Sequence, residues 1–448
     1  MFPLARARMA SPAGAPLVAV RAALADDTRD TRGLSFALIL ALVIATFEGP
    51  VRYALNGLHL DPLIFVRDAA LVGALALFVA ARLAVNAVPA SVGAFALLAL
   101  VHGLVAYFNI GSIIPAAYGL KMFLPALCGF LAAGTLARPG RRLVGLVAVM
   151  WVAAVIGATV DKFWLDYPWV GLNVELGGLN VYIGRDWQSG EIERVGGLAR
   201  SSINLAVLMP LLSFMLLTRL TSRVLATIVC TLTFAVLVWT TQKGAILGYG
   251  LAVLALLLSS RASSAPLKAA VLLSAVLLVF APTVLIHFDM PSDRGVFSFQ
   301  SLIERIREMW PNAWGWIGKF PPFLGVGLGG IGGGQRFFAP ADFNPSDNLF
   351  IYLFGNFGVA SLVYLAGAVL IAMNAEIREP RRDGLVLASL VFLLTYGLVI
   401  SLIEDPIASM WMGATLGWLA TLQPPRRSLV ARRRAEGATS ASAGRRAP

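Results

Sequence analysis

The chain has 448 residues, of which 58% are hydrophobic and only 13% are charged, and its mean hydropathy is +0.78. Because a soluble globular chain carries about a quarter charged residues, this composition excludes that class and indicates a protein that folds in lipid. The net charge of +12 is not read as a nucleic-acid signal, since the basic residues follow the membrane topology that the apolar runs predict. Cys128 and Cys230 lie inside apolar runs, so they carry no information about disulfides.

About twelve apolar runs predict membrane-spanning helices, because a helix needs about 20 mostly apolar residues to cross the bilayer core. The expected fold is an all-α polytopic membrane bundle over residues 33–422, with tails at 1–32 and 423–448. No short apolar core with a cleavage site precedes the first run, so we expect no removable signal peptide. In chain order, the expected helices are 33–47, 62–81, 88–107, 113–135, 142–160, 203–218, 222–239, 243–260, 266–286, 347–373, 384–402 and 405–422.

The basic residues predict the orientation, since Lys and Arg of short loops gather on the cytoplasmic side. With the N-terminus inside, every inner segment carries at least one Lys or Arg, and the acidic residues concentrate outside. We therefore expect a multi-pass protein of the bacterial inner membrane with both termini cytoplasmic. The loops 161–202 and 287–346 then lie in the periplasm, and the Arg-rich stretch 426–446 is expected to be a disordered anchor near anionic lipid.

The loop 287–346 contains a predicted amphipathic helix. Its charged face includes Arg305 and Arg307, and Trp314 and Trp316 follow it. Such a helix is expected to lie in the outer headgroup layer, either as a lid resting on the membrane or as a gate for a lipid-tailed substrate. The apolar residues at helical spacing are Leu302, Ile303, Ile306, Met309 and Trp310.

The run GVGLGGIGGG at 325–334 invites a phosphate-binding interpretation. However, it lacks the preceding strand and the Lys-Ser/Thr ending of a P-loop, and it lies on the side of the membrane where nucleotide is absent. We expect a close-packed turn that brings backbone near a substrate.

Three cationic residues are expected at the outer ends of helices, namely Arg194, Arg200 and Lys243. Guanidinium groups bind phosphate through paired hydrogen bonds, and an ammonium supplies a compact charge, so these residues are candidate ligands of a pyrophosphate. Alternatively, their side chains reach lipid headgroups or pair with Glu191 and Glu193.

Carboxylates also lie near the expected helix ends. Asp347 is a candidate general base for a sugar hydroxyl, but Ser346, Asp347 and Asn348 are all residues that cap helix N-termini, so capping is the alternative. Ionisable residues in or near spans either form structural ion pairs or face a wet cavity. They are Arg67, Asp68, Lys121, Glu404 and Asp405. The three histidines form no cluster, and no metal site is predicted.

Three stretches together resemble the O-antigen ligase and O-antigen polymerase superfamily of bacterial membrane glycosyltransferases. The first two are RVGGLARSSINLAVLMPLL at 194–212 and TTQKGAILGYG at 240–250. The third joins the Trp-containing helix and glycine-rich turn at 305–333 to SDNLFIYLFGNFGVASLVYL at 346–365. The resemblance implies a C-type glycosyltransferase-like fold and an inverting transferase without metal or other cofactor. It also implies two substrates, an undecaprenyl-diphosphate-linked glycan donor and a glycan acceptor.

Carried over by position, the resemblance implies that Arg194 or Arg200 holds the donor pyrophosphate. Lys243 stands where the family often has Arg, and Asp347 stands where the ligase branch has His, which favours a polymerase-like member with Asp347 as base. Arg305 and Asn348 are candidate loop contacts.

The sequence leaves two alternatives to a glycosyltransferase. The first is a secondary transporter or a lipid-linked glycan flippase, which would also have about twelve spans. The second is a purely structural membrane protein. Membrane lipids and other polysaccharide-assembly proteins are candidate partners, and nucleic acid is not expected.

Overall fold

The structure is a computed structural model that describes residues 31–423 except 177–178, 187, 190–191, 261–262 and 289–298. The expected anchor at 426–446 and most of both predicted tails therefore lie outside the described residues. Every expected apolar run within them is helical over most of its length, because the runs are rich in Leu, Ala and Val and bury an apolar surface.

The first half of the bundle contains a bent pair of helices, with an angle of 81° between α2 and α3. This half comprises α2 (Arg32–Thr46), α3 (Glu48–Gly57), the 3₁₀ turn η2 (Asp61–Phe65), α4 (Val66–Ala84), α5 (Ala90–Ile110), α6 (Ile114–Leu131), α7 (Ala133–Ala137) and α8 (Arg141–Phe163).

The second half begins with four consecutive long helices, α9 (Ser202–Leu217), α10 (Arg223–Trp239), α11 (Lys243–Leu258) and α12 (Ala265–Val284). The 3₁₀ turn η3 (Leu285–His287) ends α12. After the loop 287–346, the chain forms α15 (Leu349–Phe357), α16 (Ala360–Asn374), α17 (Pro380–Tyr396), the 3₁₀ turn η7 (Leu402–Glu404) and α18 (Pro406–Thr421).

Five helical segments of the described chain are long and apolar enough to cross a membrane, or six if the bent pair α2–α3 is one span. The five comprise η2 with α4, α5, α6, α8, and α12 with η3. Shorter apolar helices are α9, α10, α11 and α16. These helices confirm the expectation of a mostly helical protein with several helices that could cross a membrane.

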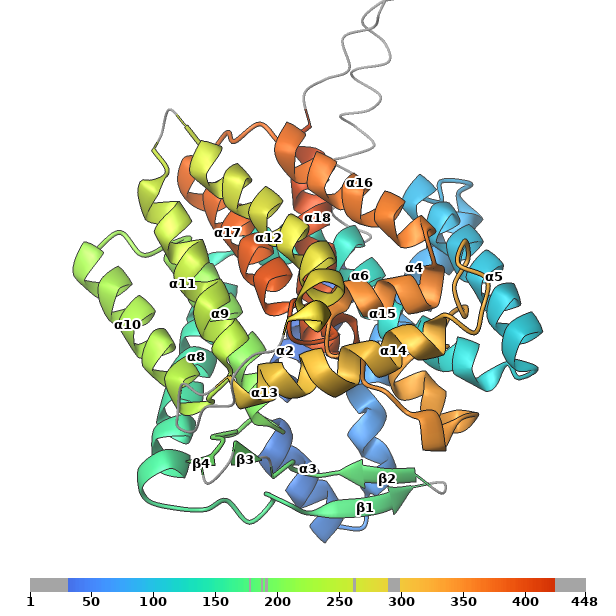
Figure 1. Ribbon diagram of the computed structural model, residues 1–448. Coiled ribbons are helices and arrows are strands. Elements are labelled where there is room, and N and C mark those ends of the chain that lie inside the picture. The colour runs from blue at the N-terminus through green and yellow to red at the C-terminus, as the bar shows by residue number, and fades with distance from the viewer. Residues whose placement is uncertain are drawn as a thin grey trace, which may run out of the picture.

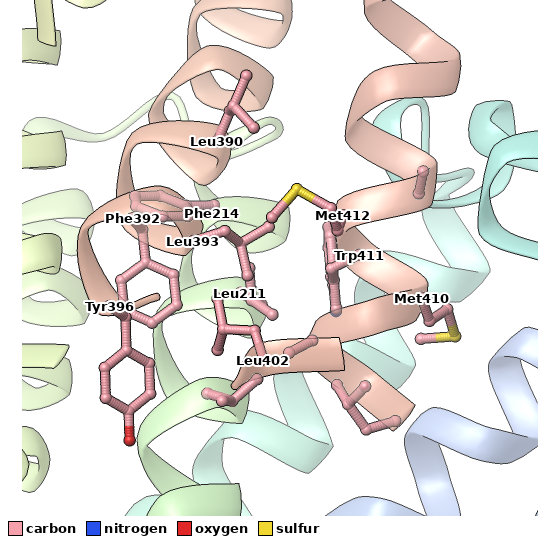
Figure 2. Packing of buried hydrophobic residues seen from close by; sticks show 14 of the residues in the cluster. Leu211, Phe214, Leu390, Phe392, Leu393, Tyr396, Leu402, Met410, Trp411 and Met412 are labelled. Atoms are coloured by element: carbon pink, nitrogen blue, oxygen red, sulfur yellow. The ribbon is translucent and has the colours of Figure 1, made fainter. Parts of the chain in front are cut away.

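Close backbone contact holds the centre of the bundle together. In the α6–α18 pair, a Cβ at Gly129 would meet the Met410 carbonyl, and one at Gly413 would meet the Ala126 carbonyl. Glycines therefore allow these two helices to approach as small residues do in membrane bundles. Beside them, α9 is buried on almost every face, and Figure 2 shows Leu211 and Phe214 of this helix among buried side chains of α17 and α18.

The expected helix 347–373 is two helices, α15 and α16, rather than one. Gly358 separates them with φ of 59°, a left-handed conformation that glycine adopts without a Cβ penalty. A Cβ at this position would also collide with the Pro322 carbonyl. Apolarity alone did not reveal the break, because the sequence is hydrophobic on both sides of it.

The expected outer loops gather at one end of the bundle (Figure 1). Residues after α8 form two antiparallel hairpins, whose strands are β1 (Asn173–Leu176) with β2 (Leu179–Tyr182), and β3 (Gln188–Ser189) with β4 (Ile192–Glu193). In the register of the first hairpin, Asn173 is opposite Tyr182. The later loop forms two 3₁₀ turns, η5 (Gly332–Phe337) and η6 (Pro340–Asp342).

The predicted amphipathic helix is present as a continuous segment that crosses the bundle (Figure 1). It consists of α13 (Gln300–Glu304), the π-helical turn η4 (Arg305–Met309) and α14 (Trp310–Ile317). Its tryptophans contact the protein: Trp310 is 1% exposed, and Trp314 Nε1 donates to the Pro282 carbonyl at 3.2 Å. The apolar face of this helix therefore packs on the bundle.

Basic residues of the opposite end hold carbonyl groups at helix ends. Arg381 Nε donates to the Leu217 carbonyl at 2.9 Å, and Lys268 Nζ donates to the Met373 carbonyl at 2.8 Å. Cations stabilise the carboxyl ends of helices in this way. Both residues belong to segments that are expected to lie inside.

Candidate functional site

A cavity of about 490 Å³ lies at the end of the bundle that carries the hairpins. Helix ends and loops from both halves of the chain line it, including Ser201 before α9 and Pro406 at the start of α18. Its acidic lining residues are Asp68, Asp347, Glu404 and Asp405. Its cationic lining residues are Arg52, Arg67, Lys121, Arg185, Arg200 and Arg336. Cations outnumber carboxylates, so the cavity favours an anionic occupant.

One wall of the cavity is an ion-pair network. Arg67 pairs with Asp68 of its own helix at 3.1 Å and with Glu48 at 3.3 Å. Lys121 binds the other oxygen of Asp68 at 2.7 Å, and Arg52 binds Glu48 at 2.6 Å. The ion pairs expected for Arg67 are confirmed, and the network also faces the cavity. Arg67, Asp68 and Lys121 therefore form structural ion pairs and also line the cavity.

Arg200 reaches the cavity from the loop that precedes α9. Asp161 holds this loop by accepting hydrogen bonds from the backbone N–H groups of Gly196 and Gly197 at 3.0 and 2.7 Å. Ser201 then caps α9 by accepting from the Asn204 N–H. The Arg200 guanidinium is thus carried on a loop that is fixed at both ends.

The cations of the cavity crowd one another. Burial, with Arg200 and Arg336 nearby, lowers the pKa of Arg185 to about 10. The buried Nε groups of Arg52 and Arg200 make no hydrogen bond within the part of the chain that the structure describes. Guanidinium groups that line a cavity can donate charged hydrogen bonds to the oxygens of an anion.

Asp347 also lines the cavity. Its alternative role as the N-cap of α15 is excluded by the position of Asn348. Asn348 caps α15, because its Oδ1 accepts from the Ile351 N–H at 2.9 Å, so the capping interpretation of Asp347 is wrong. Asp347 instead accepts a hydrogen bond from Arg305 Nη2 at 2.8 Å. Burial raises the pKa of Asp347 above its ordinary value, and Arg305 opposes that shift. The φ of 36° at Asp347 departs from ordinary backbone geometry.

Glu404 is a second carboxylate of the cavity, and sequence reasoning did not assign it a chemical role. Its Oε1 accepts from the Gly333 N–H, and Ser401 lies at 3.5 Å from Oε2. Burial is the main cause that raises the pKa of Glu404 to about 7. The available signal was an ionisable residue at the outer end of an apolar run.

The other predicted site residues lie beside the cavity rather than on its wall. Arg194 and Lys243 are not among its lining residues, and both are within electrostatic range of Arg305. Burial and Arg305 lower the pKa of Arg194. Of the four residues proposed for chemistry, Arg200 and Asp347 therefore share the cavity, whereas Arg194 and Lys243 lie near the cation that holds Asp347.

The glycine-rich run is a close-packed turn, as expected. A Cβ at Gly329 (φ 77°) would collide with the Pro115 carbonyl on α6. The Gly329 N–H donates to Asn356 Oδ1 at 2.6 Å. This packing brings Gly333 to the cavity wall and its N–H to Glu404.

Among the residues that the structure describes, no three His, Cys, Asp or Glu side chains are grouped so that they could hold a metal ion. Comparisons with models of known protein families, with curated protein sequences and with solved structures each found no match. Function is therefore inferred from the chemistry of the cavity and from the sequence motifs.

Proposed function

We propose that this protein is a glycosyltransferase that joins undecaprenyl-diphosphate-linked glycans at the periplasmic face of a bacterial inner membrane. The observation that carries the proposal is a cation-rich cavity at one end of an apolar helical bundle, with Asp347 and Glu404 on its wall. Such a cavity suits a substrate whose anionic diphosphate lies at the membrane surface. The product would be an O-antigen or exopolysaccharide chain.

The proposed topology has about twelve spans of a C-type glycosyltransferase-like bundle and both termini in the cytoplasm. This topology requires that the shorter apolar helices, such as α9, also cross the membrane. Helix α9 has 16 residues, which corresponds to about 24 Å of helix against a bilayer core of about 30 Å. Because protein surrounds α9 on nearly all sides, its ends need not reach the lipid surfaces themselves.

The donor diphosphate would bind the cations of the cavity, with Arg200 and Arg52 as central ligands. Both residues line the cavity, and phosphate oxygens accept charged hydrogen bonds from guanidinium groups. When the bond between the sugar and the diphosphate breaks, negative charge grows on the leaving oxygen. Fixed guanidinium groups stabilise this charge without reorganising, so neither nucleotide nor metal is required in this scheme.

The acceptor hydroxyl needs a base as its oxygen attacks the anomeric carbon, with inversion. The proton passes to a carboxylate, and the diphosphate leaves with the bonding electron pair. Asp347 is the base that the family resemblance implies. Glu404 is the second candidate, favoured because Gly333 N–H and Ser401 contact it, whereas Asp347 is bound to the guanidinium of Arg305.

A secondary transporter or a flippase is the alternative function. Transporter sites tend to lie near the bilayer midplane between repeats, whereas this cavity lies where the loops 161–202 and 287–346 gather at one end of the bundle. The cavity position therefore favours the transferase.

The test is a reaction of the purified protein with a defined lipid-diphosphate oligosaccharide, with a chelator and without nucleotide. Growth of the glycan supports a transferase, whereas movement of the lipid across a vesicle without growth supports a flippase. In a deletion strain, accumulation of single lipid-linked repeats indicates a polymerase, and accumulation of long lipid-linked chains indicates a ligase. The Asp at 347 in place of His favours the polymerase.

A further inference from the structure

We infer that Glu48 is a positioning residue of the cavity, which holds the Arg52 and Arg67 guanidinium groups in the arrangement that receives a diphosphate. This inference rests on the proposed function and adds a residue that does not itself contact the substrate. Glu48 is the first residue of α3, its side chain is 3% exposed, and it is not among the residues that line the cavity. It can therefore affect an occupant only through the residues that it binds or through its charge.

The two carboxylate oxygens of Glu48 bind two different guanidinium groups. Oε1 lies 2.6 Å from Arg52 Nη2, and Oε2 accepts a hydrogen bond from Arg67 Nη1 at 3.3 Å. Each guanidinium also has a second partner. The Tyr182 carbonyl accepts from Arg52 Nη1 at 2.8 Å, and Asp68 accepts from Arg67 Nε at 3.1 Å. Because both arginines line the cavity, their orientation is set before an anion binds, which lowers the cost of binding.

The start of α3 is also bound to the loop that carries Arg200. The Gly49 N–H donates to the Leu198 carbonyl at 3.0 Å, and a Cβ at Gly49 would collide with the Trp169 ring. A glycine at this position therefore allows α3 to pack closely against the loop. Glu48 lies within electrostatic range of Arg200, so the start of α3 fixes the spacing of three cations of the cavity.

The charge of Glu48 and its positioning role predict opposite effects on anion binding. Removal of the negative charge leaves more net positive charge beside the cavity, which by itself would strengthen the binding of an anion. Loss of the carboxylate that holds Arg52 and Arg67 would weaken binding, because charged hydrogen bonds from a guanidinium depend on its orientation. The direction of the change in affinity therefore separates the two explanations.

The test is the binding of inorganic pyrophosphate to the purified full-length protein in detergent, measured by isothermal titration calorimetry. Glu48→Gln keeps the size of the side chain, but its amide nitrogen cannot accept from a guanidinium, so Kd should rise about tenfold. Glu48→Asp keeps the charge but is one methylene shorter and cannot span both arginines, so Kd should rise here too. The control Glu175→Gln removes the same charge from an exposed position on β1 and should leave Kd unchanged.

An unchanged or lower Kd for Glu48→Gln would overturn the inference. If that variant does not fold, Glu48→Asp carries the test, and a wild-type Kd for it would overturn the inference. A general effect on folding is separated by the Arg67→Gln background, in which Glu48→Gln should raise Kd less than it does in the wild type. Equal rises in the two backgrounds would also overturn it, as would a wild-type protein that does not bind pyrophosphate. Binding of pyrophosphate without glycan growth would refute the proposed function alone.

Discussion

Replacement of Glu404 by Gln separates the two candidate bases. Glutamine keeps the size of the side chain and an oxygen that can accept from the Gly333 N–H, but it cannot take a proton from an acceptor hydroxyl. A general base contributes about 100-fold or more to rate. If Glu404 is the base, we expect Glu404→Gln to lower kcat by at least about 100-fold while the protein stays folded.

The raised pKa of Glu404 predicts how strongly kcat changes with pH. Because burial raises the pKa of Glu404 to about 7, the carboxylate that can accept a proton predominates only above that pH. Its fraction rises from about one-tenth near pH 6 to about nine-tenths near pH 8, so kcat of the wild-type protein should rise about tenfold over that interval. Glu404→Gln should lose this rise.

The assay is glycan growth from a defined lipid-diphosphate donor at saturating concentration, with Asp347→Asn as the matched variant. Asp347→Asn should retain the pH-dependent rise if Glu404 is the base. A Glu404→Gln protein with the wild-type rate and the same rise would refute this assignment. Loss of the rise in Asp347→Asn, with its retention in Glu404→Gln, would return the role to Asp347.

Further predictions concern anion binding, helix capping, backbone packing and stability. Arg200→Ala should raise KM for the donor about tenfold or more, since charged hydrogen bonds contribute about 1.5–3 kcal/mol. The control variant Lys319→Ala removes an exposed cation outside the cavity and should leave KM unchanged. Asn348→Ala should lower the thermal midpoint in detergent, because a lost N-cap costs about 1 kcal/mol; an unchanged midpoint would contradict the capping geometry. Gly329→Ala should reduce the yield of folded protein, measured by size-exclusion chromatography, because its Cβ would collide with the Pro115 carbonyl. The raised pKa of Glu404 gives a stability contribution that is full below about pH 4.5 and is lost as pH rises through about 7, so Glu404→Gln should melt above the wild type near pH 8.

The sequence alone predicted a mostly helical, multi-pass membrane protein and most of its apolar helices, but not the break at Gly358. Hydropathy and the positions of Lys and Arg are local properties of each segment, so they can be read without knowing how segments pack. Arg200 and Asp347 were found in this way, as polar residues next to the starts of apolar helices. The role of Asp347 was not, because a shift of one residue decides whether Asp347 or Asn348 caps α15.

Only the tertiary structure decided which polar residues meet. The Glu48–Arg67 pair joins residues on different helices, and Glu404 accepts a hydrogen bond from Gly333 of the glycine-rich turn at the cavity wall. These meetings depend on how helices pack, for example on the close approach of α6 to α18 at Gly129. Such packing arises from contacts between segments far apart in the chain. The hydrophobic periodicity of one helix does not predict which other helices it contacts.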